Sequence, residues 1–462
     1  MNTKKVIILI VLIPSLLLFN AKTAKAAAPF RDLVAVSALL IEADSGEILF
    51  EYNKTERHPA DALAKIMTLM LAAAACSDYY ADPREPVVMT ESAWFNINSN
   101  SATLGILPGE EMTLLDLMYC AFMGSNEACN LIAEHIAGSV DVFVENMNAR
   151  AKALGCENTN FTNTHGQYNS NQYTTAMDQY IIFREALSNP LFVEISGVYR
   201  YSTESTNMSE PRSLVSTNSL LNTNGKYFYG PCTSGLASAT FEGGYSCIAF
   251  AEADELSLIS VVLGSDIIIL EDESTQMRNL TESRRLFEWG FSAFGWRTIL
   301  SSSELVAKAP VLNGAGADFV NLRPESSIEL LLDKDVPLEQ FKRTITIYSD
   351  EDGEPLTAPV AAGDILGEIT LTRSGVLYGP IQLLANTNIE LHRLVFIKMQ
   401  ITDVLSSSIA RVIITALIVL IVIYIGLVVR YNLVRRKRLR RIKAAKKRLA
   451  EERRAGPRDP WT

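Results

Sequence analysis

Histidine and cysteine are the side chains that most often build metal or redox sites, and their spacing in this chain fits neither. The four histidines lie far apart: His58, His135, His165 and His392. None of the six cysteines forms a C-x-x-C pair: Cys76, Cys120, Cys129, Cys156, Cys232 and Cys247. We therefore expect no metal and no cofactor. We interpret His135 and His165 as structural, and Cys120 and Cys129 as buried thiols, with one isolated disulfide left open.

Lys65 is a cation in an apolar segment, 62–75, which is rich in Ala, Leu and Met and contains no Gly or Pro. This composition favours a buried helix, in which the amine fits side-chain packing and ligand binding equally well. Asp61 as a nucleophile would form an acyl-aspartate, which is an anhydride, so we do not expect hydrolysis by that route. Neither Ser125 nor Ser234 precedes a lysine by one helical turn, and we interpret both as loop residues.

The elements that position these residues form an α/β pattern with a mostly helical middle. A strand pair with an Asp44-Ser45-Gly46 turn is predicted over 34–52, and strands return at 245–252 and 256–263. Pro59 and Asp61 mark the start of the first helix, and Ser139 and Thr174 are expected to cap the helices that follow them. The predicted helices cover 62–75, 113–122, 127–137, 140–154, 175–187 and 273–289. One sheet is therefore expected to be assembled from both ends of this domain.

Shorter segments follow Trp296, separated by Gly, Pro, Asp and Asn, and they predict a small all-β domain. The predicted strands cover 305–311, 327–332, 344–348, 365–372 and 375–384. A helical segment at 389–404 leads from this domain toward the end of the chain.

The distribution of charge indicates a membrane-anchored protein. The net charge of −10 combines a tail of 33 residues that carries +11 with a body that carries −21. The 18 uncharged residues from Val412 to Val429 are long enough to span a bilayer, and the basic cluster that begins at Arg430 follows them. The positive-inside rule then places the tail in the cytoplasm and the body outside. Directly after a membrane span, a basic tail sets the orientation of the chain and attracts anionic lipid headgroups. We therefore expect no nucleic-acid partner.

The N-terminus has the pattern of a secretory signal peptide. Lys4 and Lys5 precede an uncharged run over 6–19, and the small residues around Ala26 fit a cleavage site. An uncleaved anchor is the alternative, but the run is shorter than the ~20 residues that a span needs.

Several blocks, in order, resemble those of the serine D-alanyl-D-alanine carboxypeptidases, the low-molecular-mass penicillin-binding proteins. The blocks are Pro59-Ala60-Asp61-Ala62-Leu63-Ala64-Lys65-Ile66-Met67-Thr68, Gly124-Ser125-Asn126-Glu127-Ala128-Cys129-Asn130, Phe161-Thr162-Asn163-Thr164-His165-Gly166 and Thr217-Asn218-Ser219-Leu220-Leu221. The resemblance extends from about Asp32 to about Leu384. It implies an α/β (α+β) penicillin-binding or β-lactamase-like transpeptidase domain, a small β-domain and one transmembrane helix, in the layout of enzymes from Gram-positive spore-forming bacteria.

The sequence patterns and the resemblance together give the expected boundaries. They are signal peptide 1–26, carboxypeptidase-like domain 28–297, β-domain 301–388, linker helix 389–411, transmembrane helix 412–429 and basic cytoplasmic tail 430–462.

The family works through three motifs, S-x-x-K, S-x-N and K-T-G, which perform acyl transfer from peptides that end in D-Ala-D-Ala. The serine attacks after the lysine one turn later takes its proton, and backbone N–H groups stabilise the oxyanion. The S-x-N loop relays protons and holds the substrate amide. The K-T-G strand offers a cation and a hydroxyl to the terminal carboxylate.

This sequence departs from all three motifs. Alignment on Lys65 places Ala62 at the nucleophilic serine, and alignment on Asn126 places Gly124 at the serine of the second motif. In the third block Thr233 takes the lysine position. The binding residues that the resemblance then implies are Thr233, Ser234, Gly235 and Leu236, with backbone donors expected at Ala62 and Leu236.

The resemblance therefore implies an inactive homologue that binds peptidoglycan stem peptides or wall-synthesis proteins. The alternatives are an active carboxypeptidase with atypical residues and a structural platform whose groove is vestigial. Loss of a catalytic nucleophile typically costs on the order of 10⁶ in rate, which favours the inactive homologue.

Overall fold

The computed structural model describes residue 30 and residues 32–78, 80–269, 275–351 and 353–454. The chain divides into two compact units. Unit 1 runs to Ile299 and includes Ile328–Gln340, and unit 2 holds Leu300–Ser327 and the chain from Phe341 onward. The predicted signal peptide lies outside the described residues.

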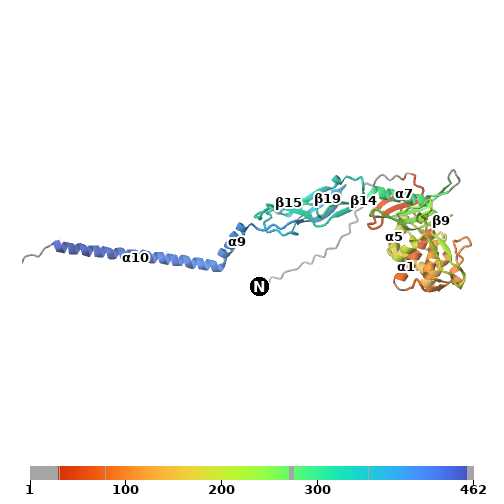
Figure 1. The fold of residues 1–462 in the computed structure, drawn as a ribbon, viewed down its shortest axis with the longest axis horizontal. Helices are drawn as coiled ribbons and strands as arrows, with labels where there is room; N and C mark the ends of the chain where they lie inside the picture. The colour runs from red at the N-terminus through yellow and green to blue at the C-terminus, as the bar shows by residue number, and fades with distance from the viewer. Residues whose placement is uncertain (1–29, 31, 79, 270–274, 352, 455–462) are drawn as a thin grey trace, which may run out of the picture. The chain divides into compact units, whose positions relative to one another are not determined.

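A five-stranded antiparallel sheet forms the centre of unit 1 (Figure 1). Its order is β2 (Ile48–Tyr52), β1 (Ser37–Glu42), β11 (Leu256–Ser265), β10 (Gly244–Ala253) and β9 (Cys232–Thr240). Strand β1 pairs with β11 from Ser37 opposite Leu263 to Glu42 opposite Leu258. The sheet is therefore assembled from both ends of the domain, as predicted.

Helices cover both faces of this sheet, so both sets of alternating side chains are buried. Leu39 and Ile41 of β1 pack into the core beneath the helical region, whereas Ala38 and Leu40 pack with α7 on the opposite face. All six residues of β1 are buried as a result. The helices of the first face are α1 (Ala64–Ser77), α2 (Leu114–Met123), α3 (Asn126–Ala137), α4 (Val140–Ala153), α5 (Ala176–Leu187) and α6 (Pro190–Gly197).

Side-chain caps set the starts of these helices. Ser139 accepts a hydrogen bond from the Val142 N–H and caps α4, as predicted. The predicted cap at Thr174 is wrong by one residue: Thr175 accepts from the Asp178 N–H, whereas Thr174 belongs to a short strand.

Helix α7 (Arg278–Ala293) begins later than the predicted 273–289, because residues 275–277 form a strand paired with 267–269. The other short elements of unit 1 are η1 (Asp61–Leu63), η2 (Ser92–Trp94), η3 (Ser219–Leu221), β3 (His58–Pro59), β4 (Pro86–Val88), β5 (Glu111–Thr113), β6 (Tyr173–Thr174), β7 (Arg200–Ser202), β8 (Ser213–Val215), β12 (Ile267–Ile269), β13 (Thr275–Met277), β14 (Phe294–Leu300), β17 (Ile328–Asp333) and η4 (Leu338–Gln340).

Unit 2 contains a second five-stranded sheet, in the order β15 (Ala307–Pro310), β16 (Phe319–Pro324), β20 (Val376–Ala385), β19 (Ile365–Arg373) and β18 (Lys342–Ile347). Strand β16 was not predicted from the sequence. The short helix α8 (Tyr348–Glu351) follows β18, and α9 (Arg393–Ser406) occupies the predicted helical segment after the sheet.

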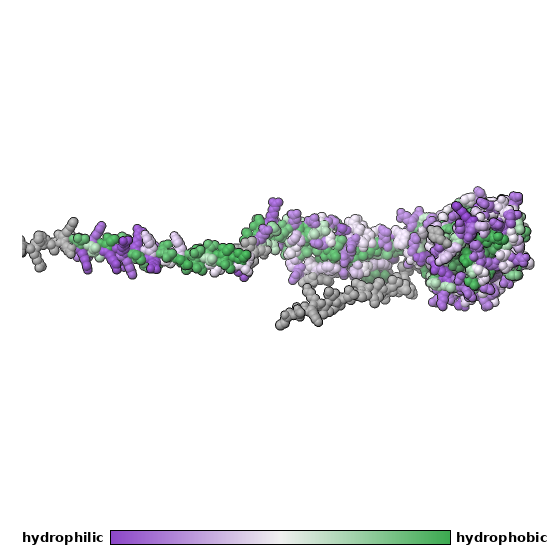
Figure 2. Space-filling model, turned by 90° about the horizontal axis from the view of Figure 1, so that it is seen from below, coloured by the Kyte–Doolittle hydropathy of each residue, from purple (hydrophilic) through white to green (hydrophobic). Residues whose placement is uncertain are grey.

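Helix α10 (Ser408–Arg454) contains the apolar run and part of the basic tail in one continuous element. It is long and apolar enough to cross a membrane, with a mean hydropathy of 3.3 over its most apolar window. Figure 2 shows an uninterrupted hydrophobic stretch followed by hydrophilic side chains along the same helix.

Gly290 of α7 allows a close approach between this helix and the sheet. A Cβ atom at this position would lie 2.7 Å from Leu258 Cδ1 and 2.8 Å from Leu40 Cδ2. We predict that Gly290→Val lowers the free energy of unfolding of unit 1 by about 1–3 kcal/mol, because overpacking forces both leucines from their positions. Urea unfolding followed by tryptophan fluorescence would measure this. Ser292→Val on the exposed side of α7 is the control, and an equal loss in both variants would contradict the prediction.

Candidate active site

The start of the first helix faces strand β9 in unit 1. The Ala62 N–H, within η1, points to Ser238 Oγ at 3.4 Å, and Ser238 is 4% exposed. The structure therefore brings the backbone donor of Ala62 and a strand hydroxyl together.

Lys65 lies one helical turn after Ala62 and is buried, with 4% of its surface exposed. Burial lowers the pKa of its amine, while the nearby Cys129 and Glu127 oppose the shift. Among the described residues no carboxylate forms an ion pair with Lys65. Burial thus favours the neutral form of the amine, which is the form that a general base requires.

Asn126 lies at the start of α3, which packs against α1, and the next residue, Glu127, organises the adjoining loop. The fully buried Glu127 carboxylate accepts hydrogen bonds from the Leu104 N–H at 2.7 Å and the Ile106 N–H at 3.4 Å. The Asn126 N–H donates to the Ala102 carbonyl at 3.0 Å. The neighbouring Ser125 hydroxyl caps α3 by accepting from the Ala128 N–H, so it serves the helix.

Gly124 ends helix α2 with φ of 145°, a region that favours glycine. A Cβ atom at Gly124 would meet nothing within 4 Å. There is space for a serine side chain at this position, but the backbone conformation disfavours one.

The loop around His165 also contacts the site, although the sequence suggested only a structural role for this residue. Thr68 of α1 donates a hydrogen bond to the Thr164 carbonyl at 2.5 Å and holds the loop against the helix. Burial, together with the charge of the nearby Lys65, lowers the pKa of His165 to about 3. His165 is therefore a neutral imidazole, and its Nδ1 accepts from the Gln167 N–H.

Asp61 is held between two glycines at a positive φ of 48°. A Cβ atom on Gly166 would lie 1.7 Å from the Asp61 carbonyl oxygen, and one on Gly243 would lie 1.7 Å from Asp61 Oδ2. The carboxylate is 2% exposed and neither oxygen accepts a well-formed hydrogen bond from the described residues. Burial raises its pKa to about 7, Thr240 opposes the shift, and Glu242 adds to it.

The residues of the third block lie at the start of β9. The Ser234 hydroxyl is buried and bonds to the Ser196 hydroxyl of α6 at 2.6 Å, while Thr233 is exposed. Gly235 and Leu236 are buried within β9, with Leu236 in the core. Ser238, four residues farther along, is the strand hydroxyl that faces Ala62. The Ser234 hydroxyl thus faces α6, whereas the Ser238 hydroxyl faces Ala62, and a binding role for Ser234 stays a prediction.

Sequence reasoning missed Ser238 because residues four apart on a strand share a face, so the burial pattern of β9 fits either register. It also missed the role of Glu127, for which the sequence carried no signal. All six cysteine side chains are free thiols. Within the described part of the chain, no group of three or more His, Cys, Asp or Glu could hold a metal ion.

The D-alanyl-D-alanine carboxypeptidase family, peptidase S11, matches residues 21–267, which is more than half of the chain. This chain belongs to that family. It is 29% identical over 344 residues to D-alanyl-D-alanine carboxypeptidase DacF of Bacillus subtilis, covering 74% of this chain and 82% of the relative. It is 28% identical over 377 residues to DacC of Escherichia coli, covering 80% and 88%.

Solved structures of penicillin-binding proteins share the fold. Penicillin-binding protein 5 of Haemophilus influenzae is 24% identical with a TM-score of 0.56, and the match covers 79% of this chain and 100% of that one. Penicillin-binding protein 6B of Escherichia coli is 22% identical with a TM-score of 0.58, and the match covers 78% and 98%. The predicted transpeptidase-like fold is confirmed.

The buried Asp61 carboxyl makes stability depend on pH. Its folded pKa of about 7 exceeds the ordinary value of 3.8, so the folded state holds a proton that the unfolded chain releases between these values. This contribution to stability is present below about pH 4 and is lost as the pH rises through 7. We predict that Asp61→Asn, which cannot ionise, becomes more stable relative to the native protein by up to about 4 kcal/mol from pH 4 to 7.5.

Urea unfolding at a series of pH values would measure the difference between Asp61→Asn and the native protein. The exposed Asp335, in the same unit, provides the control variant Asp335→Asn. A difference between Asp61→Asn and native protein that stays constant from pH 4 to 7.5 would contradict the prediction.

Proposed function

We propose that this protein is a non-hydrolytic member of the carboxypeptidase family that binds peptidoglycan stem peptides through a groove, which we assign to the place where the start of the first helix faces β9. The observation that carries this proposal is an alanine, with no side-chain nucleophile, at position 62, where the N–H at the helix start points to Ser238. In the proposed assignment Ala62 stands where the family's serine attacks. Without a hydroxyl there, no acyl-enzyme can form at this position.

A shift of alignment does not restore the first motif. The segment from Pro59 to Cys76 contains no serine, and no serine anywhere in the chain stands three residues before a lysine. The hydroxyl of Thr68, within this segment, is bonded to the loop carbonyl of Thr164.

The third motif also lacks its cation in every register. No Lys or Arg occurs between Lys226 and Arg278, a stretch that includes all of β9, β10 and β11. A peptide carboxylate beside Ser238 would therefore find a hydroxyl but no strand lysine with which to pair. This supports a weaker and less charge-dependent mode of binding than the family motif provides.

The remaining groups support binding. The Ala62 N–H and the Ser238 hydroxyl lie at one side of the proposed groove, and Lys65 and Asn126 supply further polar groups from the two helices. These groups can donate hydrogen bonds to a peptide without breaking one of its bonds.

The second candidate is a carboxypeptidase that uses atypical residues. The buried amine of Lys65, whose pKa is lowered, favours this candidate. The third candidate is a structural platform with a vestigial groove, whose partners would bind the β-domain or the tail. Binding of a stem peptide, measured by calorimetry, separates the first candidate from the third.

We also propose that α10 anchors the protein in the cell membrane by a single pass. The body would lie outside the cytoplasm and the basic tail within it. The run of basic residues after the apolar stretch of α10 supports this orientation.

Incubation of the full chain in detergent with fluorescent penicillin, and separately with a peptide ending in D-Ala-D-Ala, tests the loss of chemistry. We predict no covalent adduct and no release of D-alanine. In Ala62→Ser, Lys65 lies one turn after the new hydroxyl, so we expect slow formation of an adduct. Its rate should remain orders of magnitude below that of an intact family enzyme, because the strand cation is still missing.

The matched control is Ala74→Ser, which adds a hydroxyl at another half-buried position of α1 and should remain unlabelled. A stoichiometric adduct on the native chain would overturn the proposal, and mapping the labelled residue would identify the actual nucleophile.

A further inference from the structure

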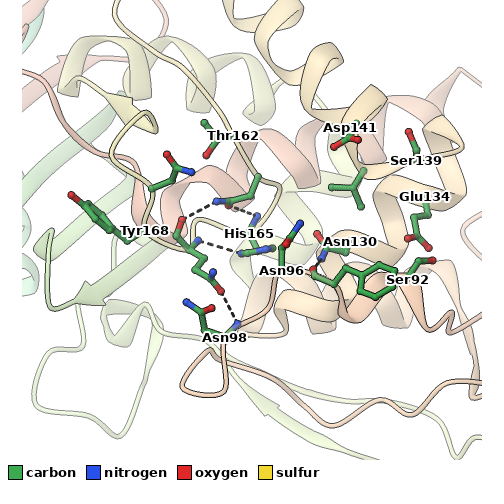
Figure 3. A pocket seen from close by; sticks show the side chains of 15 residues that line it. Ser92, Asn96, Asn98, Asn130, Glu134, Ser139, Asp141, Thr162, His165 and Tyr168 are labelled. Carbon is green, nitrogen blue, oxygen red and sulfur yellow. Dashed lines mark hydrogen bonds between the residues drawn. The ribbon is translucent and has the colours of Figure 1, made fainter.

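A polar pocket of about 560 Å³ lies in unit 1, and none of Ala62, Lys65, Asn126 and Ser238 lines it (Figure 3). Its walls come from the loop 92–98, helix α3, the start of α4 and the loop 162–169. The proposed peptide-binding residues therefore lie outside this pocket.

Part of the wall is fixed by hydrogen bonds and forms a scaffold. The Asn163 side chain accepts from the His165 and Gly166 N–H groups and donates to the Gln167 carbonyl. The Gln167 side-chain oxygen accepts from the Asn98 N–H at 3.0 Å and the Ser101 hydroxyl at 2.7 Å, which joins the two loops. The pocket is therefore built by contacts between distant segments of the chain.

Other polar groups of the lining remain available to a ligand. Among the described residues, the side chains of Asn96, Asn98 and Tyr168 form no hydrogen bonds with protein groups. An amide offers two donors and two acceptor sites, and a tyrosine offers a hydroxyl and a ring face. His165 adds a neutral donor, because its Nδ1 already accepts from the Gln167 N–H and its proton is therefore on Nε2.

The aromatic side chains and the charges of the lining restrict the class of ligand that the pocket can bind. Phe95 is 69% exposed and Tyr168 is 50% exposed, so both rings can offer a face. No Lys or Arg lines the pocket, whereas Glu134 and Asp141 do. Figure 3 shows these two carboxylates at one end and Tyr168 at the other. An anionic ligand would meet only repulsion here, since the lining contains no cation to pair with it.

We propose that this pocket binds a neutral saccharide, of the N-acetylated hexosamine type that forms glycan chains. Such sugars have hydroxyls and amides that pair with side-chain amides and carboxylates, and an apolar ring face that stacks on aromatic side chains. The inference does not depend on whether the acyl-transfer chemistry has been lost.

The loop 162–169 connects the saccharide pocket to the proposed peptide groove. His165 lines the pocket and lies near Lys65, and the next residue, Gly166, packs against the Asp61 carbonyl. The family acts on peptidoglycan, in which sugars and peptides are covalently joined. One peptidoglycan chain could therefore place a sugar in the pocket and its attached peptide near Ala62.

Titration of the full chain in detergent with chitotetraose, a peptide-free chain of N-acetylglucosamine, tests this proposal. Calorimetry should show saturable binding with a Kd of about 1 mM or tighter. The variant Asn98→Ala/Tyr168→Ala should raise the Kd at least about tenfold, because it removes an amide and a ring while leaving the scaffold bonds of Asn163 and Gln167 in place. Binding should change little between 50 and 500 mM salt, since the ligand is uncharged.

The matched control is Asn224→Ala/Tyr80→Ala, which removes the same side chains at exposed positions outside the lining. It should leave the Kd within about twofold of the native value. Absence of saturable binding at 10 mM chitotetraose, or equal losses in the two double variants, would overturn the proposal. It would also be overturned if a lysine-containing stem peptide occupied the pocket in a salt-sensitive way while chitotetraose did not. Loss of stem-peptide binding alone would affect only the proposed function.

Discussion

The close packing around Asp61 is the constraint on which the rest of the site depends. The chain enters α1 through a residue with positive φ, whose carbonyl oxygen lies against Gly166 and whose carboxylate lies against Gly243. This contact joins the helix start, the His165 loop and the β9–β10 turn, which come from three distant parts of the sequence. It fixes the direction of the Ala62 N–H toward β9 and the depth at which Lys65 is buried.

The positioning groups of the site depend on packing contacts of the helical region. Glu127 still organises the loop before α2, and Thr68 still holds the loop of His165. Both interactions belong to the folding of the helical region, so they persist whatever residue stands at position 62. The family fold can therefore accommodate different residues at this position, because packing and chemistry depend on different atoms.

Much of the fold follows from local signals. The hairpin over 34–52 and the helices of the middle region follow from turn residues, periodicity and caps such as Ser139. Strand β16 was missed because its pairing with β20 joins residues about sixty positions apart and because it ends at Pro324, which reads as a strand breaker. The start of α7 was misplaced because Met277 ends a two-stranded pairing that has no periodic signal.

The candidate site could be only half predicted. Ala62, Lys65 and Asn126 were indicated by the resemblance to the family motifs, and the structure brings the elements that hold them together. Ser238 required the register of β9 against η1, and the proximity of His165 to Lys65 required a tertiary contact across a hundred residues. Neither contact leaves a pattern in the local sequence.

Because α10 is continuous, it determines how far the basic residues extend from the membrane. At about 1.5 Å per residue, the apolar run 412–429 measures roughly 27 Å, close to the thickness of a bilayer's hydrocarbon core. The helix continues to Arg454 without a break, which adds roughly 37 Å beyond this run. Its first basic residues would contact lipid headgroups, whereas the last turns would extend several Debye lengths from the membrane surface if the helix stands upright. The tail would then act as a stiff rod whose distant charges face solvent, where a soluble partner can reach them without touching the bilayer.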